Sequence, residues 1–436
     1  MAKELDPNDP TPWFYDAIRK QTANRPVEAL HDMQKAIELN DNRAVYRSKL
    51  LLDEDLAARS ATIGRMYNEL GFESRGLVEG WKSIYTDPAN YSAHRLLADS
   101  YFFSPRRGIA RVSELLQSQL LQPINITPVQ PQLAESDLFL LGGLGPAAPS
   151  LNEFNPLFLR DRFALLASGI VGGNGTWGDE VVQSGLLEKL SYSLGQYHFE
   201  TDGFRPNNDF QQDIYNLFIQ GALSPNSSVQ AELRSTEVEE GERRLNFFLD
   251  NFDPNFHQNR KTETARLGFH HGFSPRSDLL AFFIYKKVEG GFQTTHPSIN
   301  FSGELKEEAY LIEGQHLVRW AGLNLVSGAG HFDTLGRQEK IVADFFIPFP
   351  RSTLDETEAN IQHTNVYLYS YFNYGESLTL ILGASGNFFK GTLVERNQFN
   401  PKIGLMWRPS SETILRAAAF RVLEPGLSIG QTIEPI

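Results

Sequence analysis

The chain contains no cysteine among its 436 residues, which excludes thiol catalysis, cysteine-based metal sites and disulfide frameworks. That absence is compatible with the cytoplasm, the periplasm or the outer membrane, so it does not decide the compartment. Runs of lysine and arginine are also missing, and the formal net charge is −13. Because phosphate backbones are bound by clustered cations, we expect no nucleic-acid partner.

Long hydrophobic runs are absent as well. No stretch approaches the roughly 18 consecutive apolar residues that indicate a transmembrane helix. A transmembrane β-barrel is compatible with this absence, because its strands alternate apolar and polar residues and keep the mean hydropathy low. The N-terminus lacks the basic and apolar segments of a secretory signal.

Two segments near the N-terminus share an ending. Residues 3–8 and 37–42 align so that Leu5 falls on Leu39, a spacing of 34 residues. This is the period of tetratricopeptide (TPR) repeats, in which each helix pair buries its apolar face by stacking on a neighbour. We therefore predict an all-α TPR solenoid over residues 1–121, and by analogy of architecture a protein partner for it.

Local signals divide this helical region further. Pro26 opens a predicted helix with its apolar residues on one face, and later helices are predicted over 91–102 and 106–121. The next segment, 122–157, is rich in proline and glycine, so we predict a junction or small plug there. Met1 falls inside a repeat and the chain ends in a predicted loop, so we expect truncation at both ends.

The apolar period changes to two in the rest of the chain, 158–436. Short turn signals at 224–228, 274–278, 374–377 and 408–412 alternate with longer polar loops near 240–258, 290–303, 334–360 and 390–398. Segments beside the turns run for about 10 to 13 residues, enough to cross a bilayer when tilted. Tight turns at one end and long loops at the other are typical of an outer-membrane barrel. We predict an antiparallel transmembrane-type β-barrel, incomplete at about 13 strands.

Alternation assigns faces to these strands. Because neighbouring strand residues point to opposite faces, we expect one apolar set to face lipid: Val229, Ala231, Leu233, Leu267, Phe269, Ile403 and Leu405. Aromatic residues near strand ends are expected in the interfacial girdle: Tyr197, Phe199, Tyr367, Tyr369, Tyr371 and Trp407. The lumen-facing candidates are Gln196, His198, Glu200, Glu232, Arg234, Arg266, His270, Lys402 and Arg416.

The order of TPR array, proline-rich junction and hairpin-rich region resembles bacterial outer-membrane proteins that fuse periplasmic TPRs to a barrel. These include exopolysaccharide exporters, and residues 194–209 are similar to a signature of TPR-plus-barrel sequences described as TonB-dependent-receptor-like. The resemblance implies an outer-membrane location with the TPR part in the periplasm. The 36 residues from 122 to 157 are too few for the globular plug of a true TonB-dependent receptor.

Catalytic and metal-binding constellations are not found in the sequence. His270 and His271 point to opposite faces of a strand, so they cannot jointly hold one metal as a helical i, i+4 pair can. His331 and Asp333 share a face, but no nucleophile motif accompanies them. We predict no catalytic residue, no cofactor and no metal site, and therefore no enzyme.

Two functions remain open at this point. The first is an outer-membrane channel with a periplasmic TPR scaffold, moving a polysaccharide or another polar solute. The second is a soluble TPR adaptor with a β-rich protein-interaction domain.

Overall fold

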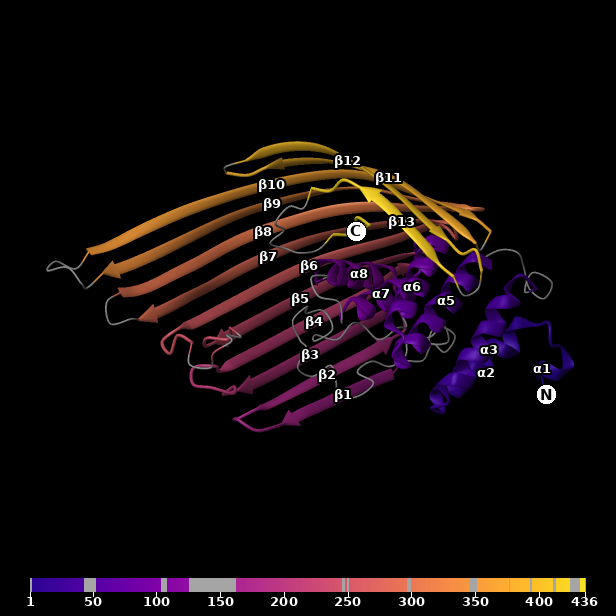
Figure 1. The fold of residues 1–436 in the computed structure, drawn as a ribbon, viewed down its shortest axis with the longest axis horizontal. Helices are drawn as coiled ribbons and strands as arrows, with labels where there is room; N and C mark the ends of the chain where they lie inside the picture. The colour runs from indigo at the N-terminus through magenta and orange to yellow at the C-terminus, as the bar shows by residue number, and fades with distance from the viewer. Residues whose placement is uncertain are drawn as a thin grey trace.

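A computed structural model describes residues 2–42, 52–102, 108–124, 162–244, 248, 251–295, 299–344, 351–375, 377–392, 394–410, 413–423 and 432–435. The predicted junction at 122–157 lies outside these residues apart from 122–124. An N-terminal helical region precedes one large antiparallel sheet (Figure 1).

The helices occur in sequential pairs. They are α1 (Ala2–Leu5), α2 (Pro10–Thr22), α3 (Pro26–Glu38), the short 3-10 helix η1 (Asn40–Asn42), α5 (Leu52–Glu69), α6 (Glu73–Thr86), α7 (Tyr91–Phe102) and α8 (Gly108–Leu121). Local signals start them: Asp9 accepts a hydrogen bond from the Thr11 amide at 2.8 Å before α2, and Pro26 is the first residue of α3. Among the described residues, no helix is both long and apolar enough to cross a bilayer.

Each helix pair buries an apolar face against the next helix. Ala17, Ala29 and Met33 of α2 and α3 are fully buried together with Met66 of α5. One contact joins the two segments aligned in the sequence, because Asn42 Nδ2 donates to the Asn8 carbonyl at 3.2 Å across 34 residues. The helix pairs are thus observed, whereas their assignment to the TPR family stays a prediction.

Thirteen strands follow in the part of the chain that the structure describes, and each is antiparallel to the next in sequence order. Their bounds are β1 (Arg162–Val171), β2 (Trp177–Leu187), β3 (Leu190–Thr201), β4 (Phe210–Ser224), β5 (Ser227–Glu240), β6 (His257–Ser274), β7 (Ser277–Thr295), β8 (Ile299–Trp320), β9 (Leu323–Asp344), β10 (Arg351–Tyr374), β11 (Leu378–Lys390), β12 (Glu395–Trp407) and β13 (Leu415–Phe420). The predicted strand number agrees with this count. Among the described residues β1 and β13 are not paired, so the sheet is open, as expected for an incomplete barrel.

The predicted short turns agree with the structure, whereas two of the predicted long loops do not. The four predicted short turns connect β4 to β5, β6 to β7, β10 to β11 and β12 to β13. The predicted loops near 290–303 and 334–360 are wrong over most of their length, because β7 to β10 extend to 19, 22, 22 and 24 residues. These strand extensions carry charged residues on both faces, such as Lys306 beside Glu307, so they show no apolar alternation.

The sheet is arched, and α5 to α8 lie on its concave side (Figure 1). Three leucines of α8 share one buried cluster with inward side chains of β7 to β10. The sheet members of this cluster are Leu280, Phe282, Ile284, Ala309, Leu311, Leu317, Val326, Phe332, Tyr367, Tyr369 and Tyr371. Helix packing therefore gives the concave face a large apolar area of its own.

The segment that resembles a family signature forms an ordered loop between β3 and β4. Asn207 Nδ2 donates to the carbonyls of Asp253 and Phe256 at 2.7 and 2.9 Å, and the Glu242 amide donates to the Asn207 carbonyl at 2.7 Å. Gly203 has φ +76°, and a Cβ there would lie 2.2 Å from the Asn208 carbonyl oxygen. The loop therefore requires glycine for both its backbone angle and its close packing.

We expect Gly203→Ala to loosen this loop more than Gly375→Ala loosens the β10–β11 turn. Both positions have positive φ, but a Cβ at Gly375 meets nothing within 4 Å. Amide hydrogen exchange at Glu242 should accelerate in the first variant and stay unchanged in the second. Equal exchange in both would contradict the packing argument.

Candidate functional site

The concave face is joined to α8 by side-chain amides. Gln230 Nε2 donates to the Gln119 carbonyl at 2.5 Å, and Gln220 Nε2 donates to the Gln122 carbonyl at 2.9 Å. Between them, Leu120 packs over Gly268 of β6, where a Cβ would lie 2.6 Å from Leu120 Cδ2. The end of α8 is therefore seated in a slot that only a glycine leaves open.

Beside this slot lies a buried charge cluster. Glu232 accepts hydrogen bonds from Arg266, from Arg234 at 2.9 Å and from Asn216 at 2.7 Å. Arg266 also donates to Gln119 of α8. Burying these charges is costly unless every partner stays in place, so the cluster favours one seating of α8 over others.

A second polar contact holds the C-terminal end of α6. The amides of Asn324 and Asn373 both donate to the Tyr85 carbonyl, at 2.6 and 2.7 Å. These groups satisfy a carbonyl in the last turn of α6, which has no helical partner of its own. Arg319 adds ion pairs to Glu54 at 2.6 Å and Asp87 at 3.1 Å.

The predicted lumen-facing residues divide between the two faces. The concave face holds Glu232, Arg234, Arg266, His270, Lys402 and Arg416. Arg416 lies over the Trp81 ring of α6, with its guanidinium carbon 3.6 Å from the ring centroid. Whether these side chains line a lumen remains a prediction.

The assignment of Gln196, His198 and Glu200 to that face is wrong. In β3 the buried, inward residues are Tyr197 and Phe199, so the polar residues between them point to the convex side. His198 Nδ1 is 2.7 Å from Asp213 Oδ1 there. The alternation of residues correctly separates the two faces of β3. The prediction is wrong about which face is the inner one, because the apolar residues point inward.

The predicted aromatic girdle needs the same correction. Tyr197, Phe199, Tyr367, Tyr369 and Tyr371 all lie on the concave face and are buried. Trp407 lies on the convex face and is exposed. The docked helices give Tyr367, Tyr369 and Tyr371 an apolar surface to pack on, whereas Tyr197 and Phe199 pack with Ile214 within the sheet itself.

The convex face carries an exposed apolar band. Large apolar side chains with more than a third of their surface exposed include Val229, Leu233, Leu267, Phe283, Ile312, Val366, Leu368, Phe399, Ile403 and Leu405. At Glu263, Lys287 and Glu308, which pair across β6, β7 and β8, the outward residues become charged. The convex surface thus has a sharp boundary between an apolar and a charged zone.

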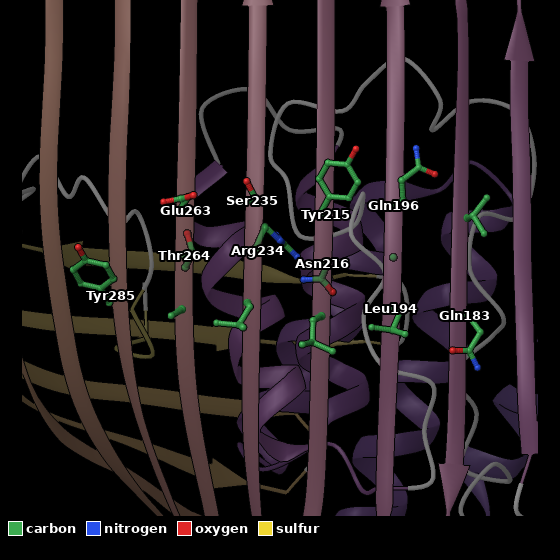
Figure 2. A pocket seen from close by; sticks show the side chains of 15 residues that line it. Gln183, Leu194, Gln196, Tyr215, Asn216, Arg234, Ser235, Glu263, Thr264 and Tyr285 are labelled. Atoms are coloured by element: carbon green, nitrogen blue, oxygen red, sulfur yellow. The ribbon is translucent and has the colours of Figure 1, made fainter.

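A shallow groove of about 910 Å³ lies at this boundary, across β2 to β7 (Figure 2). Tyr215, Ser235 and Glu263 lie toward one end of the view, and Leu194 lies lower. The helices lie behind the strands, so most of the lining side chains point away from them. The groove therefore belongs to the outer surface and not to the concave site.

A smaller cavity of about 440 Å³ lies on the concave side near the long-loop end of β6, β7 and β8. Its polar lining includes Arg260, Thr262 and Glu307. Two large apolar residues each face a glycine on the adjacent strand, since Phe292 pairs with Gly303 and Leu305 pairs with Gly290. We call this cavity the concave cup. Because Gly290 and Gly303 have no side chains, the ring of Phe292 is left partly exposed beside the polar groups.

Among the described residues, no group of three or more His, Cys, Asp or Glu side chains could hold a metal ion. The helix docking and the concave cup were missed from the sequence. The inward glycines at 268, 290 and 303 were the available signal, because glycine in a strand marks close approach.

Comparisons with known proteins address the fold. No protein-family model and no curated protein matches the sequence. Among solved structures, the copper transporter OprC aligns with a TM-score of 0.51 and 12% identity over 60% of this chain and 45% of that chain. The ferric citrate transporter FecA aligns with a TM-score of 0.49 and 12% identity, covering 59% and 43%.

The ferripyoverdine receptor of the outer membrane of Pseudomonas aeruginosa aligns with a TM-score of 0.46 and 13% identity, covering 59% and 41%. The chain therefore spans less than half the length of these three structures. The OprC match shows that the sheet has the fold of part of that transporter. It shows neither a TPR array nor an exopolysaccharide exporter.

We expect the buried pair Glu232–Arg266 to couple α8 to the sheet. Arg266→Met should lower the free energy of unfolding by about 3–5 kcal/mol, because it leaves a buried carboxylate with fewer partners. Adding Glu232→Leu should cost less than the sum of the single changes. A double-mutant cycle in denaturant measures the coupling. Lys287→Met, in an exposed pair with Glu289, is the control and should change little; strict additivity at 232 and 266 would refute the coupling.

We also expect pH to act on the helix docking through Asp87. Burial raises the pKa of its carboxyl group from 3.8 to about 6, although Arg319 lowers it. Because the folded-state pKa is the higher one, this carboxyl's stabilising contribution is present below about pH 4 and is lost as pH rises through 6. Thermal unfolding at pH 4 and pH 7 should show a smaller difference for Asp87→Asn than for the wild type. An unchanged difference would exclude Asp87 as the titrating group.

Proposed function

We propose that this chain forms part of the wall of an outer-membrane transport protein, with its helical domain seated inside that wall, and that it moves a polar solute. The observation that carries the proposal is the opposite character of the two faces. The convex face exposes an apolar band, while the concave face is polar or covered by helices. This is the arrangement that a lipid-facing exterior and a hydrophilic interior require.

The dimensions of the band support a membrane. On β6 the outward residues from Ala265 to Phe273, of which His271 is the polar member, span eight residue steps, roughly 26 Å along the strand at about 3.3 Å per step. Strands of transmembrane barrels tilt by about 35–45°, so this length corresponds to a height of roughly 20 Å, close to the about 25 Å of their apolar bands. The charged residues beyond Glu263 then lie outside the hydrocarbon, as their solvation requires.

The band also argues against the soluble adaptor. A soluble protein rarely exposes a contiguous apolar patch of more than a few hundred Å². Here such residues recur on the convex side of most strands from β3 to β12. An adaptor would need a partner over nearly the whole convex surface, whereas a bilayer covers it without one.

The position of the helical domain supports an orientation of the wall in the membrane. Its contacts with Asn324 and Asn373 lie at the short-turn ends of β9 and β10. Short turns face the periplasm in outer-membrane barrels, so we place the helices on that side. The exposed part of the TPR-like pairs, α2 and α3, is then available for a periplasmic protein partner.

For the solute we propose a saccharide. Sugar rings are bound by an aromatic or apolar platform surrounded by hydrogen-bonding groups. The concave cup offers Phe292, whose ring centroid lies 5.5 Å from that of the tilted Phe301 ring, and Leu305 with 39% of its surface exposed. Gln258, Arg260 and Thr262 supply polar groups on the same face. The similar structures are named for copper, ferric citrate and ferripyoverdine, so the saccharide rests on the cup of this chain and not on those names.

We expect Leu267→Arg to cost about 2–4 kcal/mol of stability in a phospholipid bilayer, because position 267 lies within the apolar band. Leu305→Arg should cost much less, because Leu305 faces the concave cup. Both leucines are partly exposed, at 59% and 39%, but Leu305 lies on the other face and beyond the charged boundary at Glu308. Unfolding from vesicles measures both changes, and equal costs would refute the lipid-facing assignment.

We expect an engineered disulfide between Leu120→Cys and Gly268→Cys to hold α8 in its slot and reduce solute flux. The Leu120 side chain lies against the Cβ position of residue 268, so the two cysteines start close to bonding range. Efflux of an uncharged oligosaccharide from proteoliposomes should fall on oxidation and recover on reduction. The single Leu120→Cys variant is the control on this cysteine-free background. Flux that ignores the disulfide would show that α8 does not gate the path.

A further inference from the structure

A four-residue segment, Thr432–Pro435, lies between α8 and the concave face. The Ile433 side chain is fully buried in the cluster formed by α8 leucines and inward residues of β7 to β10. The Thr432 amide donates to Ser113 Oγ of α8 at 3.1 Å, across 319 residues. The segment therefore contacts helix and sheet together.

Side chains of β8 bind the backbone of this segment. Glu313 Oε2 accepts the Ile433 amide at 3.1 Å and the Thr432 hydroxyl at 2.9 Å. Gln315 Nε2 donates to the Ile433 carbonyl at 2.5 Å. One acceptor and one donor, two residues apart on one strand face, thus match the N–H and C=O of a single residue, which is a pattern specific to peptide chains.

The next residue of the segment is bound by its charge. Glu434 accepts a hydrogen bond from Asn365 Nδ2 at 2.8 Å and from the Tyr369 hydroxyl at 2.5 Å. Lys402 Nζ donates to the Pro435 carbonyl at 3.0 Å. The site therefore selects an apolar residue followed by an acidic one.

Glycines on neighbouring strands make room for this site. A Cβ at Gly328 would lie 2.4 Å from the Tyr367 hydroxyl oxygen, and one at Gly383 would lie 2.0 Å from Tyr369 Cδ1. Both tyrosines can therefore lie flat across the sheet and reach Glu313 and Glu434. The sequence thus places glycine wherever a tyrosine of this site must cross the adjacent strand.

The sheet alone provides few hydrogen-bond partners for the buried polar side chains of this site. Glu313 and Gln315 are 2% and 1% exposed, and apart from the segment their hydrogen bonds in the described structure run to the Tyr367 hydroxyl, at 2.8 and 3.2 Å. A buried carboxylate that loses two donors pays a desolvation cost. An occupant with peptide donors is therefore strongly favoured here.

We propose that Glu313, Gln315, Asn365, Tyr369 and Lys402 form a peptide-binding site, and that Thr432–Pro435 is its exchangeable internal ligand. Bound, the segment bridges Ser113 of α8 to β8, β10 and β12. Released, it removes the bridge through Ser113 and leaves α8 held by its leucines alone on this part of the sheet. This goes beyond the proposed transport function and does not depend on the identity of the solute.

The first test uses the full chain and a fluorescent peptide of sequence TIEP. Ile433→Asp should weaken the internal ligand, so the variant should bind the peptide about tenfold or more tightly than the wild type, in which the tethered segment competes at high effective concentration. Peptides TDEP and TIKP should bind weakly. Adding Gln315→Leu should abolish binding, whereas His316→Leu, on the opposite face of β8, should not. A folded Ile433→Asp protein that binds no TIEP would overturn the proposal, as would equal binding of TIEP and TDEP.

A second measurement covers the case in which Ile433→Asp fails to fold. A single Cys at position 433, made by Ile433→Cys, should be protected from an aqueous thiol reagent on this cysteine-free background. Unlabelled TIEP should increase its labelling rate by displacing the segment, and TDEP should not. Labelling that ignores TIEP would show that the segment is a fixed part of the fold.

Discussion

The structure depends on one constraint: every strand is hydrogen-bonded to its sequence neighbour. The register of these pairs decides which residues of each strand share a face of the sheet. Parity sends each residue to one of two environments. Leu267 and Ile403 go to the convex side, while Arg266 and Lys402, their immediate neighbours, go to the concave side. A slip of one residue in any strand would exchange these environments along its whole length. The apolar band and the buried charges therefore specify the same register.

This constraint explains what the sequence could predict. Helix bounds such as Tyr91–Phe102, the short turns and the strand number follow from local signals and agree with the structure. Parity alone could not tell which face of a strand is the inner one when a separate element covers it. Tyr369 and Tyr371 are predicted in an outer girdle for that reason, although both pack inward beside α8. The docking of α8 depends on contacts between residues more than a hundred positions apart, for which a single sequence carries no periodic signal.

The contact between helices and sheet is unusual in its mixture of forces. Leucines of α8 provide an apolar core, yet glutamine amides and the Glu232–Arg266 pair surround it. Such polar groups add little net stability but penalise any shifted arrangement that leaves them unpaired. An interface of this kind suits a domain that must return to one position after moving. The slot at Gly268 also favours a single position of α8, because it accommodates the Leu120 side chain.

The order of contacts along the chain has a consequence for assembly. Paired strands are sequence neighbours, so the sheet can grow hairpin by hairpin through short loop closures. The bonds from Asn324 and Asn373 to Tyr85 instead span 239 and 288 residues. Those amides point to a common position only after β9 and β10 have paired. Insertion of the helical domain is therefore a late folding event, and a cell that makes this protein must keep a finished helical bundle apart from a growing sheet until the two can meet.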